Sequence, residues 1–311
     1  MIDMTVRALL VEDNPADARL MVELLADAGA RGVQLQHVDR VSAALMNLGK
    51  QEFDIVLLDL SLPDSSGLET VSRICAADSR IPVVVLTGLE DDALALAAVQ
   101  AGAQDYLVKG QADGAVIARS IRYAIERKRL EDSLQYLATH DFLTGLPNRR
   151  LFEDRMVHAI ERARRDHMGG EEKWKLAVVL LDLDNFKSVN DTLGHAQGDL
   201  LLQVVAKHLQ KSIRKADTLA RMGGDEFTLI FENVTGTEDE EILARKIQAV
   251  FQRPFQTGGH ILEVTASIGI SLYPFDGQDA ESLLKHADIA MYIAKRARNQ
   301  ARFYRDYKDE A

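Results

Sequence analysis

The chain lacks the features that mark secreted, membrane-spanning and nucleic-acid-binding proteins. It has one cysteine among its 311 residues, Cys75, which excludes an internal disulfide. A formal net charge of −11 argues against bulk nucleic acid or an anionic membrane surface as a partner. No apolar run reaches the roughly 18 residues that a membrane span needs, and the first residues do not resemble a signal peptide. We therefore expect a cytoplasmic protein that binds neither nucleic acid nor membrane, with a length that favours two domains.

Short apolar runs alternate with helical patterns over the N-terminal part of the chain. Four of these runs are rich in β-branched residues, at 8–11, 55–58, 83–86 and 106–108, and a weaker run lies at 33–38. Near-continuous apolar strands that alternate with helices predict a parallel sheet with helices on both faces. We therefore expect an α/β fold with a doubly wound parallel sheet, in which ligands bind at the carboxyl ends of the strands.

Polar side chains follow these strands at the points where the strands end. Glu12 and Asp13 follow the first run, Asp59 the second, Thr87 the third and Lys109 the fourth. In a doubly wound sheet these groups converge on one crevice. Packed carboxylates repel unless a divalent cation lies among them, and oxygen ligands suit magnesium. Each residue alone is typical of a turn, a helix cap or a solvated surface, but the whole set favours a carboxylate that accepts a phosphoryl group beside a metal.

Residues 5–126 resemble a response-regulator receiver domain through LLVEDNPAD, VLLDLSLPDSSG, VVVLTG and DYLVKG. The resemblance implies a flavodoxin-like sheet in which Asp59 is the phosphoacceptor. It also implies one magnesium ion, bound by Glu12, Asp13, Asp59 and the backbone carbonyl of Ser61. The phosphate would come from a cognate histidine kinase or a phosphotransfer protein. We assign residues 1–125 to this domain.

The resemblance also implies a switch that responds to phosphorylation. Thr87 and Tyr106 match the pair of side chains that re-orient when the phosphoacceptor is modified, and Lys109 matches the lysine that contacts the phosphoryl group. Gly110 stands where the family often has proline, which loosens the following loop and touches no chemistry.

The segment 114–139 predicts one long helix that joins the two halves of the chain. It carries no strand signal and no glycine or proline after Gly114, and its apolar residues recur at a spacing of three and four. We expect its first half to pack on the receiver sheet. In the connector, residues 126–139, Leu130, Leu134 and Leu137 favour a helix–helix seam, although only about two heptads are available.

Two adjacent glycines mark a tight turn in the C-terminal half. Gly223 and Gly224 precede Asp225 and Glu226, and a strand is expected directly afterwards. A Gly-Gly pair between strands predicts a hairpin because the turn needs positive φ. Because glycine has no side chain, the pair also lets a ligand approach the backbone closely. If the apolar run that ends at Asp182 pairs with this hairpin, three carboxylates lie side by side. Such a cluster again indicates magnesium, which in nucleotidyl transfer neutralises a triphosphate and activates a hydroxyl.

The stretch DNFKSVNDTLGHAQGDL is dense in polar groups before the next helix. Asn185, Phe186 and Lys187 can offer backbone N–H groups and a cation to phosphates. Asn190 and Asp199 can read a guanine edge, because a carboxylate accepts hydrogen bonds from both N1–H and N2–H. The same two residues are also typical of helix caps.

Residues 140–306 resemble the GGDEF diguanylate cyclase domain through DFLTGLPNRRLF, LLDLDNFKSVNDTLGHAQGD, RMGGDEF, TASIGISLYP and LLKHADIAMYIAKRARNQ. The resemblance implies a palm-like α+β sandwich over residues 140–311. It implies a reaction that condenses two GTP into cyclic di-GMP and releases two pyrophosphates. Because each domain would hold one GTP, it also implies a homodimer.

The resemblance further implies roles for individual residues of this domain. One or two magnesium ions would be held by Asp182, the Leu183 carbonyl, Asp225 and Glu226. Glu226 would be a ligand or would help to deprotonate the ribose 3′-hydroxyl, so that Asp225, Glu226 and Lys187 form the catalytic group. The remaining substrate contacts are Asn185, Phe186, Asn190, Asp199, Gly223, Gly224, Lys295 and Arg298.

Two further motifs bear on the level of activity. The family commonly reads A-K-x-x-G-R-N in its last helix, whereas here the interval from Lys295 to Arg298 is one residue short and has no glycine. We expect Arg298 to reach the phosphates still, because positions three and four residues apart are both neighbours on a helix. Arg214 and Asp217 match the RxxD motif of an inhibitory site for the product, although a solvated ion pair explains a generic RxxD equally well. A catalytically weak domain that senses GTP or cyclic di-GMP, and a receiver that only docks partners, remain alternatives.

Overall fold

The computed structural model describes residues 5–30, 32–88, 92–168 and 175–307. The chain divides into two compact units, Met1–Gln135 and Tyr136–Ala311. No helix among the described residues combines the length and the apolar composition that crossing a bilayer requires.

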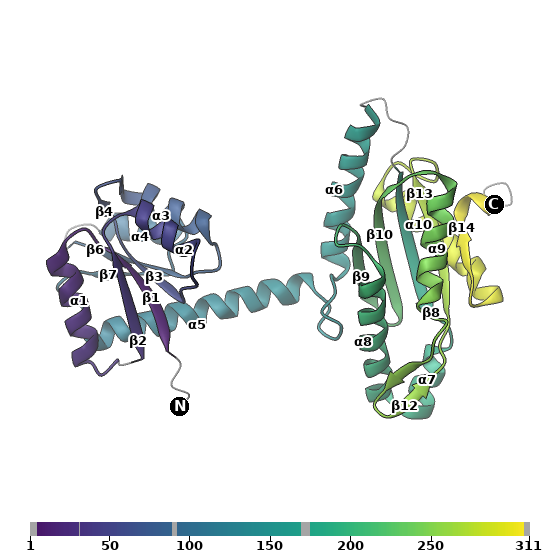
Figure 1. Ribbon diagram of the computed structural model, residues 1–311, viewed down its shortest axis with the longest axis horizontal. Coiled ribbons are helices and arrows are strands. Elements are labelled where there is room, and N and C mark those ends of the chain that lie inside the picture. Colours follow the sequence, from purple (N-terminus) through teal and green to yellow (C-terminus); the bar gives the residue numbers. More distant parts are fainter. Residues whose placement is uncertain (1–4, 31, 89–91, 169–174, 308–311) are drawn as a thin grey trace. The chain divides into compact units, whose positions relative to one another are not determined.

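The first unit is built on a five-stranded parallel sheet with the order β2-β1-β3-β6-β7 (Figure 1). Its strands are β1 Val6–Val11, β2 Val33–Val38, β3 Ile55–Asp59, β6 Val83–Thr87 and β7 Asp105–Val108. The predicted strands are therefore all present, and the doubly wound α/β fold is confirmed. A short hairpin, β4 Ser61–Leu62 with β5 Ser65–Ser66, follows β3.

Helices cover both faces of this sheet because side chains of each strand alternate between them. Leu9 and Val11 pack with α2 and α3, whereas Ala8 and Leu10 pack with α1 and α5. The helices of this unit are α1 Pro15–Asp27, α2 Val41–Leu48, α3 Gly67–Ala77, α4 Asp92–Gln100 and α5 Gly114–Thr139. Both cores are apolar, so the functional groups are left to the strand ends.

Helix α5 is the single long helix that the sequence predicts. Ile117, Ile121 and Ile125 near its start are buried against the sheet. Further along the same helix, Leu130 and Leu134 are 63% and 67% exposed. The second half of α5 thus presents leucines that nothing in the described parts of the chain covers.

The second unit is built on a five-stranded sheet with the order β14-β13-β8-β10-β9. Both neighbours of β8 run antiparallel to it, and β14 runs parallel to β13. The strands are β8 Lys175–Leu183, β9 Thr218–Gly223, β10 Glu226–Val234, β13 Ala266–Tyr273 and β14 Ala301–Phe303. A separate hairpin consists of β11 Phe255–Thr257 and β12 His260–Leu262.

Helices also cover both faces of this second sheet, which makes it an α+β sandwich (Figure 1). Leu201 and Ile247, from α8 and α9, pack on one face, and Phe152 and Leu283, from α6 and α10, on the other. The helices are α6 Arg149–Met168, α7 Phe186–Leu193, α8 His195–Ser212, α9 Gly236–Ala249 and α10 Ala280–Ala297, with a 3₁₀ helix at Tyr304–Tyr307. Gly269 on β13 permits close contact with α10, since a Cβ there would lie 2.0 Å from the Ala287 carbonyl oxygen.

Candidate functional site

The polar residues at the strand ends of the first unit meet as predicted. The Lys109 ammonium lies 2.6 Å from Glu12 Oε2 and 3.0 Å from Asp59 Oδ2. A third carboxylate, Asp17 in the first turn of α1, lies 3.2 Å from the same ammonium. Asp17 was missed in the sequence because an acidic residue at a helix start reads as an ordinary helix feature. One ammonium group therefore contacts three carboxylates, which come from the residue after β1, from α1 and from the end of β3.

Burial and charge shift the pKa values of this cluster in a consistent way. Burial raises the pKa of the Glu12 carboxyl above its usual value, although Lys109 works in the opposite direction. Burial also opposes the charged form of Lys109, but hydrogen bonds to Glu12 and Asp59 outweigh it and raise the pKa of the ammonium above its usual range. Lys109 is therefore charged at every physiological pH.

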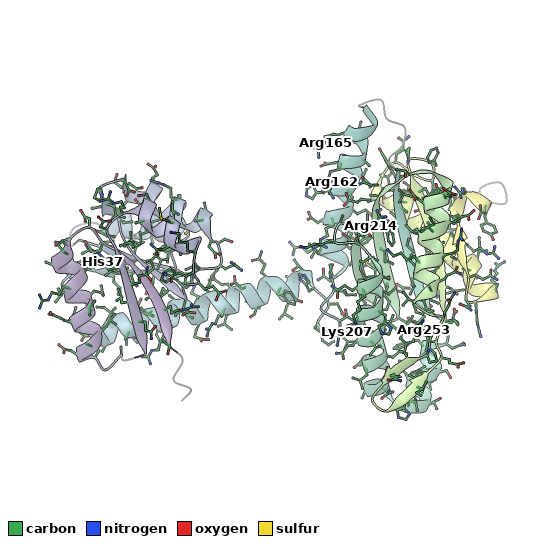
Figure 2. The ribbon with its side chains drawn as sticks, viewed as in Figure 1. His37, Arg162, Arg165, Lys207, Arg214 and Arg253 are labelled. Carbon is green, nitrogen blue, oxygen red and sulfur yellow. The ribbon has the colours of Figure 1, made fainter. Side chains whose placement is uncertain are left out.

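The carboxylates of this cluster have the spacing of a cation site. Ligand oxygens of Glu12, Asp13 and Asp59 lie within 4.8 Å of one another. Three oxygen donors around so small a volume suit magnesium, so the residues present fit the predicted ion. The carbonyl oxygen of Glu12 lies 2.7 Å from Nε2 of His37, which is marked in Figure 2. Ser61, the predicted carbonyl ligand, is exposed at the start of β4.

The predicted switch residues lie at the end of β6 and within β7. Thr87 is buried, and its carbonyl oxygen accepts a hydrogen bond of 2.8 Å from the backbone N–H of Lys109. Tyr106 is 37% exposed on β7, which pairs directly with β6. Thr87 thus adjoins the acidic cluster, and Tyr106 lies on the next strand with part of its ring in solvent.

In the second unit the Gly-Gly turn joins β9 to β10 as predicted. Gly223 and Gly224 have φ angles of 143° and 54°, which other residues rarely adopt. Glu226 pairs with Asp182 on β8, and the Leu183 N–H donates to the Asp225 carbonyl at 3.4 Å. The acidic pair of the turn and Asp182 are therefore neighbours across two strands.

A lysine from α10 completes this second acidic cluster. The Lys295 ammonium lies 2.9 Å from Asp182 Oδ2. Burial, together with the negative charges of Asp225 and Glu226, raises the pKa of the Asp182 carboxyl in spite of Lys295. Burial opposes the charge of Lys295, but Asp182 outweighs it and raises the pKa of the ammonium. Among the described residues, the three acidic side chains whose ligand oxygens all lie within 4.8 Å of one another are Glu12, Asp13 and Asp59 in the first unit. The ligand oxygens of Asp182, Asp225 and Glu226 are therefore spaced more widely.

The predicted guanine-reading residues lie on two successive helices. Asn190 is on α7 and Asp199 is an exposed residue in the first turns of α8. Asn190 Oδ1 is buried without a hydrogen-bond partner among the residues that the structure describes. Gly198 makes room for it, since a Cβ at this position would lie 1.9 Å from that oxygen. A buried, unsatisfied amide oxygen and an exposed carboxylate are both acceptors, so they fit a ligand that carries hydrogen-bond donors.

The predicted phosphate contacts begin at the amino end of α7. Asn185 has φ 59° and precedes the helix, Phe186 is buried in the core, and Lys187 is exposed. Phe186 is thus a packing residue whose side chain faces the interior. Asn185 and Lys187 remain accessible at a helix start, where backbone N–H groups attract anions.

Arg298 does not occupy the helical position that the sequence suggested. Helix α10 ends at Ala297, and Arg298 follows it with φ 58°. Arg298 therefore does not neighbour Lys295 on one helix, contrary to expectation, because the chain has already left the helix. Asp184 explains why: its carboxylate accepts a hydrogen bond of 3.0 Å from the Asn299 N–H, and others from Thr265 and Ser267. This role of Asp184 was not visible in the sequence, since its partners lie far along the chain.

Arg214 and Asp217 form a local turn beside a small cavity. The Asp217 carboxylate accepts a hydrogen bond of 2.8 Å from the Arg214 N–H. Burial raises the pKa of Asp217 although this bond and the nearby cations oppose the shift. Both residues line a cavity of about 80 Å³ that also borders Glu232, which pairs with Arg162 on α6 (Figure 2). The guanidinium of Arg214 is thus near other charged groups at an accessible edge of the sheet.

An acidic pocket at the ends of a doubly wound sheet, followed by carboxylates around a Gly-Gly hairpin, defines a class of signalling proteins that join a receiver domain to a nucleotide-cyclase type of domain. The chain belongs to the GGDEF family. The family model described as "Diguanylate cyclase, GGDEF domain" matches residues 138–301. The model described as "Response regulator receiver domain" matches residues 8–120.

Curated relatives support this membership. The chain is 43% identical over 189 residues to the bifunctional diguanylate cyclase/cyclic di-GMP phosphodiesterase MucR of Pseudomonas aeruginosa, covering 61% of this chain and 27% of MucR. It is 40% identical over 185 residues to the diguanylate cyclase TpbB of the same species, covering 58% of this chain and 41% of TpbB. An uncharacterized signaling protein of Caulobacter vibrioides is 34% identical over 280 residues, covering 88% of this chain and 32% of that protein. The chain therefore spans less than half the length of these relatives.

A solved structure resembles the second unit. The structure of a shortened TpbB (YfiN) from Pseudomonas aeruginosa that comprises only the GGDEF domain superposes with a TM-score of 0.50 at 39% identity. The match covers 53% of this chain and 94% of that domain.

Proposed function

We propose that the chain is a diguanylate cyclase that condenses two GTP into cyclic di-GMP and releases two pyrophosphates. One observation supports this proposal most strongly. Asp182, Asp225 and Glu226 lie at the paired ends of β8 and β10, and Lys295 contacts Asp182. The donor set suits one or two magnesium ions, which when bound would neutralise the triphosphate and promote ionisation of the 3′-hydroxyl. The Leu183 carbonyl is proposed as a further ligand.

The chain's own residues bind and orient the nucleotide in this proposal. Asn190 and Asp199 read the guanine, which supplies the donors that the buried Asn190 oxygen lacks. Lys187 and Lys295 contact the phosphates as point charges. The other proposed substrate contacts are Asn185, the backbone N–H of Phe186, Gly223, Gly224 and Arg298. Glu226 either joins the metal ligands or takes the proton from the ribose 3′-hydroxyl.

The proposed reaction requires two chains. Each second unit offers one guanine-reading pair and one acidic cluster, yet the product contains two guanylyl units. The two nucleotides would therefore meet across a twofold axis, each held by its own chain. The exposed leucines of α5, among them Leu130 and Leu134, supply an apolar seam for such a homodimer.

The activity is tested by incubating the purified full chain with GTP and magnesium and separating the nucleotides by chromatography. We expect cyclic di-GMP and pyrophosphate from the parent protein and from Asp154→Asn, and neither from Asp182→Asn. Asp154 is a matched control because it is an exposed aspartate on α6 that belongs to none of the proposed sites. Absence of cyclic di-GMP with the parent protein at every concentration would exclude the proposal.

A second candidate is a domain that senses GTP or cyclic di-GMP with little turnover. The position of Arg298 beyond the end of α10 favours it, because the arginine is no longer held beside Lys295 by a helix. Tight GTP binding in calorimetry without pyrophosphate release would support this candidate against the first.

We propose that phosphorylation at Asp59 regulates the chain. Lys109 contacts the acceptor, Thr87 follows the β6 residue that pairs with Asp59, and Glu12 and Asp13 complete a cation site with it. The phosphate donor would be a histidine kinase or a phosphotransfer protein. Incubation with acetyl phosphate and magnesium should add one acid-stable, base-labile phosphoryl group, detected by intact mass. The same treatment of Asp59→Asn should add none, and equal labelling of both would place the phosphate elsewhere.

We also propose feedback inhibition by cyclic di-GMP at Arg214 and Asp217. An arginine guanidinium can pair with a phosphate or stack on guanine, and an aspartate can accept from the guanine edge. Arg214→Ala should weaken cyclic di-GMP binding in calorimetry and keep the initial rate for longer. Arg245→Ala, another exposed arginine of the same unit, is the control. Unchanged product binding by Arg214→Ala would exclude this site.

A further inference from the structure

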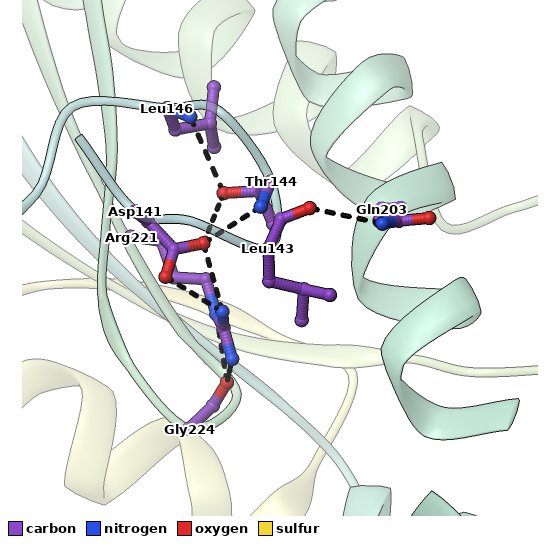
Figure 3. Close-up of polar contacts among 7 residues, drawn as sticks. All are labelled: Asp141, Leu143, Thr144, Leu146, Gln203, Arg221 and Gly224. Atoms are coloured by element: carbon purple, nitrogen blue, oxygen red, sulfur yellow. Dashed lines mark hydrogen bonds and ion pairs between the residues drawn. The ribbon is translucent and has the colours of Figure 1, made fainter. Parts of the chain in front are cut away.

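A buried arginine two residues before the Gly-Gly turn is hydrogen-bonded to the turn. Arg221 on β9 is only 9% exposed. Its Nε and Nη2 donate to the Gly224 carbonyl oxygen at 3.1 and 2.7 Å (Figure 3). Its Nη1 donates to both carboxylate oxygens of Asp141, at 2.9 and 3.0 Å. The planar guanidinium thus connects the turn to a residue 80 positions earlier.

The contact with Gly224 restrains the residue that follows it. The peptide group is planar, so fixing the Gly224 carbonyl also fixes the Asp225 N–H and Cα. The next carbonyl, that of Asp225, accepts from the Leu183 N–H on β8 at 3.4 Å. Both peptide groups that flank Asp225 are therefore held, one by Arg221 and one by β8. Without the arginine, a two-glycine turn would leave the first of them free to rotate.

Asp141 is itself held in a compact loop. Its carboxylate accepts hydrogen bonds from Thr144, at 2.9 Å from the backbone N–H and 2.6 Å from the hydroxyl (Figure 3). Burial opposes its charge, but Thr144 and Arg221 outweigh burial and lower the pKa of Asp141 below its usual value. The Leu143 carbonyl of the same loop accepts from the Gln203 side chain on α8 at 3.1 Å. The loop is therefore a charged, fixed anchor for Arg221.

The loop is also continuous with the end of α5. The rings of Tyr136 and His140 stack at 4.0 Å with an interplanar angle of 5°. Asn148 returns to the helix end, donating from its side chain to the Ala138 carbonyl at 3.0 Å and from its N–H to Thr139 at 2.9 Å. A displacement of the last turn of α5 would therefore move the loop that carries Asp141.

We propose that Arg221 and Asp141 are positioning residues for the acidic turn, and that they make its geometry dependent on the segment that follows α5. The proposal rests on the proposed cyclase function, since the turn would carry Asp225 and Glu226 to the nucleotide. Lysine cannot replace Arg221 here, because an ammonium lacks the rigid fork that reaches a carbonyl and a carboxylate together. Arg221 contacts neither the metal nor the nucleotide and acts only through the turn.

The first test compares Arg221→Lys and Asp141→Asn with Arg162→Lys in the full-length chain. Arg162 is a matched control because it pairs with Glu232 through two bonds, at 3.1 and 2.7 Å, in the same unit. We expect both test variants to lower kcat about tenfold or more, since misplacing a reacting group by about 1 Å costs on the order of a hundredfold. The magnesium concentration for half-maximal rate should rise with it, while KM for GTP changes less than about threefold because the guanine site is untouched. The double variant should be no worse than Arg221→Lys alone.

The second measurement does not depend on activity. Hydrogen exchange followed by mass spectrometry should show faster exchange of peptides covering 222–227 in Arg221→Lys and Asp141→Asn, and unchanged exchange in Arg162→Lys. Equal exchange in all three variants would overturn the proposal, and so would a fall in kcat without faster exchange. If the parent protein makes no cyclic di-GMP, the proposed function fails, and the exchange rates alone decide whether Arg221 positions the turn.

Discussion

Both units carry a cluster of carboxylates at the ends of neighbouring strands, and one lysine contacts each cluster. The two clusters differ in how far they are exposed to solvent. In the first unit, Lys109 contacts Glu12, Asp17 and Asp59, and its side chain is 25% exposed. In the second unit, Lys295 contacts Asp182 and its side chain is 39% exposed. The first cluster has the spacing of a single cation site. The second is the more open of the two.

The difference follows from how each sheet brings its residues together. Parallel strands place several carboxyl ends at one edge, so Glu12 and Asp59 arrive side by side with little help from loops. In the antiparallel sheet, neighbouring strand ends alternate in direction, and the turn at the start of β10 brings Asp225 and Glu226 to Asp182. The second cluster therefore depends on the conformation of one turn, and through Arg221 on a distant loop.

The largest expected effect is on the rate of cyclic di-GMP formation, which should depend on the second cluster and not on the first when the protein is unstimulated. Asp225→Asn should lower the initial rate of cyclic di-GMP formation by at least about a hundredfold, since metal ligation contributes several kcal/mol to such reactions. Asp59→Asn should leave the unstimulated rate unchanged, because its carboxylate lies in the other unit. The rates are measured with excess pyrophosphatase to remove one product. An equal loss in both variants would mean that the clusters are not separate in function.

The next largest effect concerns stability, and we expect Lys109 to contribute more to the free energy of unfolding than Lys295. Lys109→Met leaves carboxylates uncompensated and should lower the free energy of unfolding of the first unit by about 2–3 kcal/mol, less than for a fully buried pair because 25% of Lys109 is exposed. Lys295→Met should cost the second unit less than about 1 kcal/mol, as its contact is more exposed. Urea titration followed by hydrogen exchange of each unit measures both.

Magnesium provides the control for this ranking. Added magnesium should restore part of the stability that Lys109→Met loses, because a cation among Glu12, Asp13 and Asp59 replaces the missing charge. A larger loss for Lys295→Met than for Lys109→Met would contradict the ranking of the two clusters.

Much of this comparison could be predicted from the sequence, because it depends on local patterns. Continuous apolar runs predicted β3 and β6, and the residues after them predicted the contact of Asp59 with Lys109. The Gly-Gly pair predicted the hairpin that carries Asp225. In each case a short motif and the rules of sheet topology were sufficient.

The remaining features depend on contacts between distant segments and left no local signal. Arg221 reads as an ordinary strand residue until Asp141 is seen beside it. Asp184 resembles a second metal ligand in a D-x-D pattern, but it binds Thr265, Ser267 and the Asn299 N–H instead. The bond from the Asn299 N–H holds the chain just beyond the end of α10, and for that reason helical spacing gave the wrong position for Arg298.

A moderate effect is expected on assembly. Leu134→Asp should lower the rate severalfold at dilute protein and less at high concentration, because a charge in the α5 seam weakens pairing of two chains. Binding of GTP should stay the same, since α5 carries no substrate contact. Met46→Asp is the control, as Met46 is 60% exposed on α2. A rate independent of concentration from a monomeric parent protein would exclude the dimer.

The smallest effect is a pH dependence of stability at Asp217. Because burial raises the pKa of this carboxyl above 3.8, the native state keeps its proton to a higher pH than the unfolded chain does. The free energy of unfolding should therefore fall as pH rises from 3.8 through the raised pKa, and stay level above it. Asp217→Asn removes this titration, so its stability relative to the parent should grow over that window in urea titrations. A difference that stays constant with pH would mean that Asp217 titrates as an exposed carboxylate.

We propose above all that the cluster around Asp59 in the first unit controls the cluster around Asp182 in the second. The most direct test is the rate of cyclic di-GMP formation with and without beryllofluoride, a mimic of the aspartyl phosphate. We predict that beryllofluoride with magnesium raises the rate of the parent protein and has no effect on Asp59→Asn, while both have the same rate without it. An unchanged rate in the parent protein, or an equal increase in Asp59→Asn, would contradict control of the cyclase site by the receiver cluster.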